Sequence, residues 1–216
     1  MDKKFAIFDM DGTLVDSMGY WQQLGREFLT GKAVTGDIDG ILQRTKPMTM
    51  EESSALFVRE FGLPGTPESV MAEMNSVMDS HYRKDVLLKP GVEAYLEALR
   101  QRGVSMCVAS ATPEPLVRIC LERLGIANYF SFLLSCDAVG VGKSRPDVYL
   151  EASRRLGAQP GETAVYEDAL FAAETARDAG FYVAAVYDDG GAVQWDRLRM
   201  AADEAITDWS EAAQSL

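Results

Sequence analysis

The sequence predicts an α/β fold: a Rossmann-like parallel sheet with helices on both faces, plus an inserted all-α domain. Three observations lead to this prediction. Short apolar runs alternate with helical patterns, one long stretch lacks strand patterns, and polar residues follow several of the apolar runs directly. Strands that alternate with helices form parallel βαβ units, and a helical stretch that interrupts this order indicates an insertion.

The predicted strands are short apolar runs, the first of which lies near the start of the chain. Each run has about the length of a parallel strand that is buried on both faces. They cover residues 5–8, 105–109, 132–134, 163–166 and 182–186. Amphipathic patterns between the runs predict the covering helices, such as the one that ends before Gly103.

The inserted domain follows the first strand. Residues 17–87 show helical patterns at 21–29, 51–61 and 68–83, separated by glycines and prolines, and they show no convincing strand. The α/β pattern resumes at Lys89-Pro90-Gly91. We therefore predict a core of residues 1–16 and 88–216 and an α-helical domain of residues 17–87.

The composition is that of a globular protein and argues against several classes. The chain has 216 residues, of which 47% are hydrophobic and 25% charged, and this length can bury a core without disulfides. A formal charge of −12 without a basic stripe argues against nucleic-acid binding. We find neither a membrane-spanning run nor a signal-peptide pattern. We expect a cytoplasmic monomer or weak dimer with no membrane partner.

The cysteines and the single histidine are interpreted as structural. Cys107, Cys120 and Cys136 lack metal-binding spacing, and Cys107 and Cys120 lie in apolar patterns, so we expect reduced thiols in the core. His81 is the only histidine and lies in a polar helical stretch, so we expect it to be solvated.

Candidate catalytic residues follow four of the predicted strands. Because ligands bind at the carboxyl ends of parallel strands, these side chains should gather at one edge of the sheet. They are Asp9, Asp11, Ser110, Lys143, Glu167 and Asp168.

Their chemistry matches phosphoryl transfer. Asp9 and Asp11 are two positions apart, so an extended segment directs both to the same side. Clustered carboxylates call for a cation, and a site with oxygen ligands alone favours Mg²⁺. One carboxylate can attack phosphorus while a second transfers protons. Lys143 would compensate phosphate charge, and Ser110 would donate to phosphate oxygens.

Structural interpretations of the same residues remain open. Asp11-Gly12 is also a common turn, and Glu167-Asp168 could cap the helix that follows. We interpret Asp16 and Ser17 as a helix cap. Residues 137–144, "DAVGVGKS", end like a phosphate-binding P-loop but begin with aspartate where glycine is required, which argues against that class.

The motifs "FDMDGTLVDS", "KPGV", "VASAT", "GKSRPDVY" and "VYEDA", in this order, resemble those of the haloacid dehalogenase superfamily. They are most similar to its beta-phosphoglucomutase-like branch, in which a helical cap domain is inserted after the first strand. The resemblance implies that Asp9 is the nucleophile and Asp11 the acid/base. It implies Mg²⁺ held by Asp9, the main-chain carbonyl of Asp11 and Asp168. The remaining implied residues are the phosphate-binding Ser110, Ala111 and Lys143 and the supporting Thr13 and Glu167.

The expected function is a Mg²⁺-dependent phosphatase that hydrolyses a small phosphorylated metabolite, such as a sugar phosphate, through an aspartyl-phosphate. Because dehalogenases of the superfamily lack the second aspartate, Asp11 argues against that activity. Arg44 and Lys46, in the inserted domain, are candidates for contacting an anionic substrate.

Two alternatives remain. Sugar-phosphate mutases of the beta-phosphoglucomutase type carry a histidine and a cap arginine where this sequence has Trp21 and Met50. This difference favours the phosphatase over the mutase. The second alternative is a non-catalytic binding module on the same fold. Intact candidate catalytic residues argue against it.

Overall fold

The computed structural model describes residues 2–45, 48 and 50–216. The chain forms two compact units, one made of Met1–Met18 and Val86–Leu216 and the other of Gly19–Asp85. Within the described part of the chain, every helix is too short or too polar to cross a membrane.

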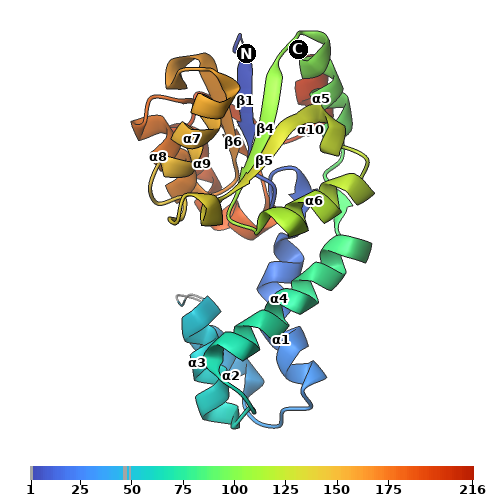
Figure 1. Cartoon of the computed structure of the whole chain (residues 1–216), viewed down its shortest axis with the longest axis vertical. Coiled ribbons are helices and arrows are strands. Elements are labelled where there is room, and N and C mark those ends of the chain that lie inside the picture. The colour runs from blue at the N-terminus through green and yellow to red at the C-terminus, as the bar shows by residue number, and fades with distance from the viewer. Residues whose placement is uncertain (1, 46–47, 49) are drawn as a thin grey trace. The chain divides into compact units, whose positions relative to one another are not determined.

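A six-stranded parallel sheet forms the centre of the first unit, in the order β5-β4-β1-β6-β7-β8 (Figure 1). Its strands are β1 (Phe5–Phe8), β4 (Ser105–Ser110), β5 (Phe130–Ser135), β6 (Thr163–Glu167), β7 (Tyr182–Val186) and β8 (Glu204–Ile206). The α/β prediction is confirmed, and the first five of these strands lie where the sequence predicts them. The sequence analysis missed β8, since three residues are too few for a recognisable pattern.

Helices cover both faces of this sheet. Figure 1 shows α7, α8 and α9 on one side and α5 and α10 on the other. The helices of this unit are α5 (Val92–Gln101), α6 (Glu114–Arg123), α7 (Asp147–Leu156), α8 (Leu170–Asp178), α9 (Trp195–Ala201) and α10 (Trp209–Gln214). The central strands are buried on both faces, as their continuous apolar sequences require. The three cysteines are buried free thiols, as expected.

The same unit also contains a separate two-stranded antiparallel sheet. It pairs β2 (Val15–Asp16) with β3 (Leu87–Leu88), with Val15 opposite Leu88. The expectation that residues 17–87 contain no strand is therefore wrong at its end, because Leu87 belongs to β3. A two-residue strand has no periodicity, and only its partner, distant in sequence, defines it.

The second unit is helical. It contains α1 (Met18–Gly31), α2 (Ile38–Thr45), α3 (Met50–Phe61) and α4 (Pro67–Lys84). Its core includes Leu24 and Phe28 of α1 and Phe57 of α3. The side chain of Thr66 accepts a hydrogen bond from the Ser69 amide and thereby caps the start of α4. The three predicted helices are present, and α2 is an additional one.

His81 differs from the expectation of a solvated side chain. It lies on α4 with its side chain only 14% exposed. Its Nδ1 lies 2.8 Å from a carboxylate oxygen of Asp85, and its Nε2 lies 2.8 Å from one of Glu27. Burial alone would lower the pKa of His81, but the two carboxylates outweigh it and the pKa is raised. The imidazolium can donate to both carboxylates, whereas the neutral ring can donate to one.

Candidate active site

Asp9 leaves the sheet at the carboxyl end of β1. Its amide donates to the carbonyl of Tyr166 at 3.0 Å, which continues the parallel pairing one residue beyond the strand. The chain then turns sharply, because the amides of Leu14 and Val15 both donate to the carbonyl of Met10, at 2.9 and 3.1 Å. We call residues 9–13 the aspartate loop.

Gly12 allows the aspartate loop to approach Asp168. It has φ +77°, a conformation that favours glycine, and a Cβ atom at this position would lie 2.3 Å from Oδ2 of Asp168. Thr13 is fully buried, with its hydroxyl 3.5 Å from Oδ1 of Asp168. The glycine of this motif is therefore required both by backbone geometry and by space.

Lys143 joins two of the acids. It is buried, and its ammonium donates to Asp9 and, at 2.7 Å, to Oε1 of Glu167. Burial opposes the charged form of Lys143, but Asp9 and Glu167 outweigh it and raise its pKa. Lys143 therefore keeps its positive charge at neutral pH and faces the carboxylate of Asp9.

Three carboxylates form a group that fits a metal ion. Asp9, Glu167 and Asp168 each offer an oxygen atom, and these atoms lie within 4.8 Å of one another. Burial, followed by the charge of Glu167, raises the pKa of Asp168 to about 7, although Lys143 opposes this rise. Burial also raises the pKa of Asp9, with Lys143 opposing and the neighbouring acids adding to it. One ammonium among three carboxylates leaves an excess of negative charge, and the all-oxygen donor set suits Mg²⁺.

Asp11 directs its carboxylate toward two hydroxyl groups. Ser17 donates to Oδ1 at 2.6 Å, and Thr112 donates to Oδ2 at 2.7 Å. Ser17, which the sequence indicates as part of a helix cap, donates its hydroxyl proton to Asp11. Asp16 lies in β2 with an exposed side chain. These contacts depend on tertiary folding, since Thr112 lies 101 positions from Asp11.

Ser110 is the last residue of β4, the strand next to β1. Its side chain is buried, and its Oγ accepts a hydrogen bond from the amide of Thr112 at 3.0 Å. Ala111 follows in an exposed bend. The predicted residues that follow β1, β4 and β6 thus lie at the carboxyl ends of neighbouring strands.

Tyr149 belongs to this site but was missed by sequence reasoning. It is fully buried on α7, and its hydroxyl donates to Oε1 of Glu167 at 2.7 Å, the oxygen that also accepts from Lys143. Burial and the Glu167 carboxylate raise the pKa of Tyr149, so its hydroxyl stays protonated and remains a donor. The signal available in the sequence was its place at the end of the motif "GKSRPDVY", six residues after Lys143.

The helix-cap interpretation of Glu167 and Asp168 is wrong. The N-cap of α8 is Ala169, and no side chain in the described part of the chain caps this helix. Both acids instead make the contacts described above. Their side chains are thus available for the site at the edge of the sheet.

The predicted substrate residues belong to the second unit. Arg44 lies in the last turn of α2 with its side chain 52% exposed, and it donates to Glu60 at 3.3 Å. Lys46 lies outside the described residues. Trp21, which occupies the position of the mutase histidine, donates to the hydroxyl of Tyr82 at 3.1 Å.

Comparison with known proteins identifies the family. The family model described as haloacid dehalogenase-like hydrolase matches residues 3–180. The chain belongs to this family. It is therefore a hydrolase, and the predicted resemblance is confirmed. The alternative of a non-catalytic module is set aside.

Relatives of this hydrolase include named phosphatases. The chain is 30% identical over 182 residues to a phosphorylated carbohydrates phosphatase of Thermotoga maritima, covering 81% of each chain. It is 28% identical to a fructose-1-phosphate phosphatase of Escherichia coli, covering 81% of this chain and 91% of the relative. The solved beta-phosphoglucomutase of Clostridium difficile shares the fold, with a TM-score of 0.71, 20% identity, and coverage of 97% and 92%.

Proposed function

We propose that this hydrolase is a Mg²⁺-dependent phosphatase that acts on a small phosphorylated metabolite of the sugar-phosphate class through an aspartyl-phosphate. One observation carries the proposal: Asp9 lies at the carboxyl end of β1 in contact with the Lys143 ammonium, beside a carboxylate group suited to a metal. Family membership supports it, as do relatives named for phosphorylated carbohydrates and fructose 1-phosphate.

In the first step a carboxylate oxygen of Asp9 attacks phosphorus and the bond to the leaving alkoxide breaks. Asp11 donates a proton to that alkoxide, which leaves as an alcohol. Lys143, Ser110 and the Ala111 amide would hold the phosphoryl oxygens. Mg²⁺, held by Asp9, the Asp11 main-chain carbonyl and Asp168 with Glu167 in support, would neutralise phosphoryl charge.

In the second step Asp11 removes a proton from water. The resulting hydroxide attacks phosphorus and the bond between phosphorus and the Asp9 oxygen breaks, which releases inorganic phosphate and restores the Asp9 carboxylate. The two hydroxyls on Asp11 suit both steps. Ser17 and Thr112 donate to the ionised carboxylate, and either hydroxyl can rotate to accept from the protonated form.

The helical unit, residues 19–85, is proposed as the cap that selects the substrate. Arg44 is the described candidate for contact with an anionic group of the substrate, and binding would require it to exchange the Glu60 carboxylate for that group. The exposure of this ion pair makes the exchange inexpensive.

The first experiment measures phosphate release from an aryl phosphate with Mg²⁺ and then with a chelator. We expect turnover that depends on Mg²⁺. The Asp9→Asn variant should stay folded but lose this turnover. Asp178→Asn, an exposed change at the end of α8, is the matched control and should keep full activity. Retained phosphatase activity in Asp9→Asn would refute the nucleophile assignment.

A second assay separates phosphatase from mutase. Hexose phosphates are supplied with and without a sugar bisphosphate, and both free phosphate and isomerised sugar phosphate are measured. A phosphatase releases phosphate without the bisphosphate. Isomerisation that requires the bisphosphate, with little phosphate release, would establish the mutase instead.

A further inference from the structure

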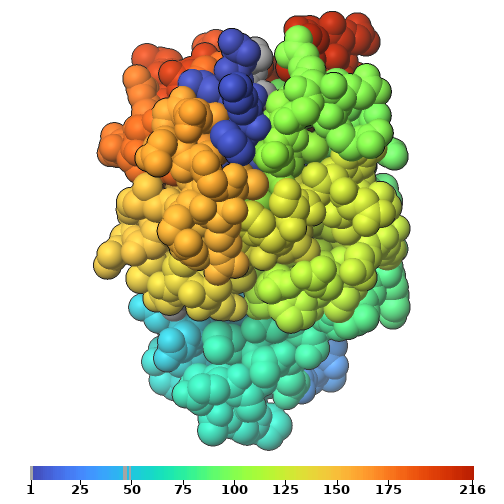
Figure 2. All heavy atoms as spheres, turned by 45° about the horizontal axis from the view of Figure 1, so that its top comes forward, coloured from blue at the N-terminus to red at the C-terminus, as the bar shows by residue number. Residues whose placement is uncertain are grey.

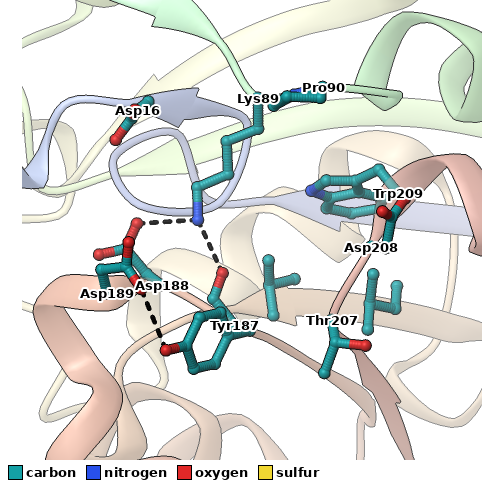
Figure 3. Close-up of a pocket in the computed structure, with 11 residues that line it drawn as sticks. Asp16, Lys89, Pro90, Tyr187, Asp188, Asp189, Thr207, Asp208 and Trp209 are labelled. Atoms are coloured by element: carbon teal, nitrogen blue, oxygen red, sulfur yellow. Dashed lines mark hydrogen bonds and ion pairs between the residues drawn. The ribbon is translucent and has the colours of Figure 1, made fainter.

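The C-terminal helix contacts the aspartate loop through one side chain. Trp209, the first residue of α10, is 3% exposed, and its indole Nε1–H donates to the main-chain carbonyl of Thr13 at 3.2 Å. The two residues lie 196 positions apart in the sequence. Figure 3 shows Trp209 at one side of a pocket of about 230 Å³ and Lys89 extending toward Asp188 at the other.

The Thr13 carbonyl needs a donor because of how the loop turns. The amides of Leu14 and Val15 both donate back to Met10, and the chain then enters β2. A buried carbonyl without a partner is costly, and the indole supplies that partner. The next carbonyl, that of Leu14, accepts from the amide of Lys89 at 3.0 Å. Two successive carbonyls at the exit of the loop are therefore held by distant segments.

Trp209 is itself held firmly. Its ring lies 4.8 Å from that of Tyr95, 5.8 Å from that of Tyr166 and 6.4 Å from that of Phe8, measured between centroids. Phe8 is the residue directly before Asp9. The indole therefore joins the end of β1 and the far side of the aspartate loop in one packed cluster.

Close packing against Gly91 and a helix cap hold α10, and with it Trp209, in place. A Cβ atom at Gly91 would lie 2.3 Å from the amide nitrogen of Ser210, so only glycine allows α10 to approach α5 this closely. Asp208 caps the helix by accepting from the Ser210 amide at 2.6 Å. Figure 2 shows the C-terminal residues, in red, directly against the green segment that contains α5.

We propose that Trp209 is a positioning residue for the aspartate loop, and that the C-terminal segment is therefore part of the catalytic apparatus. This segment lies beyond residues 3–180, the part matched by the family. Trp209 acts through Thr13 and has no contact with the phosphate-binding residues Ser110 and Lys143 among its described interactions. Its effect on turnover rests on the proposed phosphatase function, whereas its effect on loop order does not.

The test compares Trp209→Phe with Trp195→Phe. Phenylalanine keeps a ring in the cluster but removes the indole donor. Trp195 packs edge-on against the ring of Tyr187. Trp195→Phe therefore makes the same chemical change without removing a donor to the aspartate loop. We expect amide hydrogen exchange at Leu14 and Val15 to become at least several-fold faster in Trp209→Phe, with exchange in the β1 and β6 amides unchanged. We expect kcat to fall about tenfold with KM unchanged, since a small displacement of catalytic groups is costly.

The outcomes separate the two proposals. Unchanged exchange at Leu14 and Val15 in Trp209→Phe, or the same change in Trp195→Phe, overturns the positioning role. Wild-type protein without phosphatase activity overturns the proposed function, and the exchange result still decides the positioning role. If Trp209→Phe does not fold, hydrogen exchange of the indole Nε1–H groups in the wild-type protein tests the proposal instead. Exchange of the Trp209 Nε1–H as fast as that of Trp195 overturns the proposal, and much slower exchange supports it.

Discussion

Asp168 should destabilise the metal-free protein at neutral and alkaline pH. Its carboxyl has an ordinary pKa of 3.8, which burial and the neighbouring Glu167 raise to about 7. Below about pH 4 the group is protonated in both the folded and the unfolded state. Between these two pKa values only the unfolded chain releases the proton, so the free energy of unfolding falls as the pH rises through this interval.

The size of this effect follows from the displacement of the pKa. Each pH unit corresponds to about 1.4 kcal/mol, so a rise from 3.8 to about 7 costs the fold about 4 kcal/mol above pH 7. Asp168→Asn removes the charge and keeps an oxygen that can accept from Thr13. Without metal at about pH 8, the variant should therefore be more stable than the wild type by up to that amount. At about pH 5 the difference should shrink to less than half.

Urea unfolding with a chelator at both pH values measures the two free energies. Addition of Mg²⁺ at about pH 8 should then stabilise the wild type, because the ion binds the folded state, and should stabilise Asp168→Asn far less. Asp178→Asn is the control and should follow the wild type throughout. Equal or lower stability of Asp168→Asn at about pH 8 without metal would refute the electrostatic reasoning.

Three further predictions concern other residues. The stability contributed by His81 should be present below its ordinary pKa of 6.5 and lost as the pH rises through its raised pKa. Urea unfolding of His81→Gln should accordingly show a weaker pH dependence and a loss of about 0.5–1 kcal/mol at about pH 6. Gly12→Ala should lose about 1–3 kcal/mol and most activity, because its methyl group would displace Asp168. Tyr149→Phe should lose about 1–3 kcal/mol by urea unfolding, and kcat should fall about tenfold, because a donor to the acid that ends β6 is removed.

Each of these three predictions has a result that would contradict it. Gly103→Ala is the matched control for Gly12→Ala, since its φ of +74° is nearly the same but nothing lies within 4 Å of the added Cβ. Equal losses in the two variants would show that backbone strain alone acts. An unchanged pH profile in His81→Gln, or wild-type kcat in Tyr149→Phe, would refute the roles assigned to those side chains.

The sequence alone determined the α/β class and the main candidate residues. Asp9, Ser110 and Glu167 each end or directly follow an apolar run, Asp11 lies two positions beyond Asp9, and parallel strands bring such positions to one edge of a sheet. The local pattern therefore predicted which residues would lie at the carboxyl ends of neighbouring strands. It also predicted the first five strands from their continuous apolar runs, and the helices α1, α3, α4 and α5 from their amphipathic patterns.

Only the tertiary structure decided how those residues are held. Thr112 on Asp11, Tyr149 on Glu167 and Trp209 on the Thr13 carbonyl are contacts between segments far apart in the chain. A tyrosine or tryptophan in an amphipathic pattern carries no sign of which polar atom its donor will reach. Such partners depend on the relative placement of strands and helices to within a hydrogen-bond length, and that placement is set by packing of the whole core.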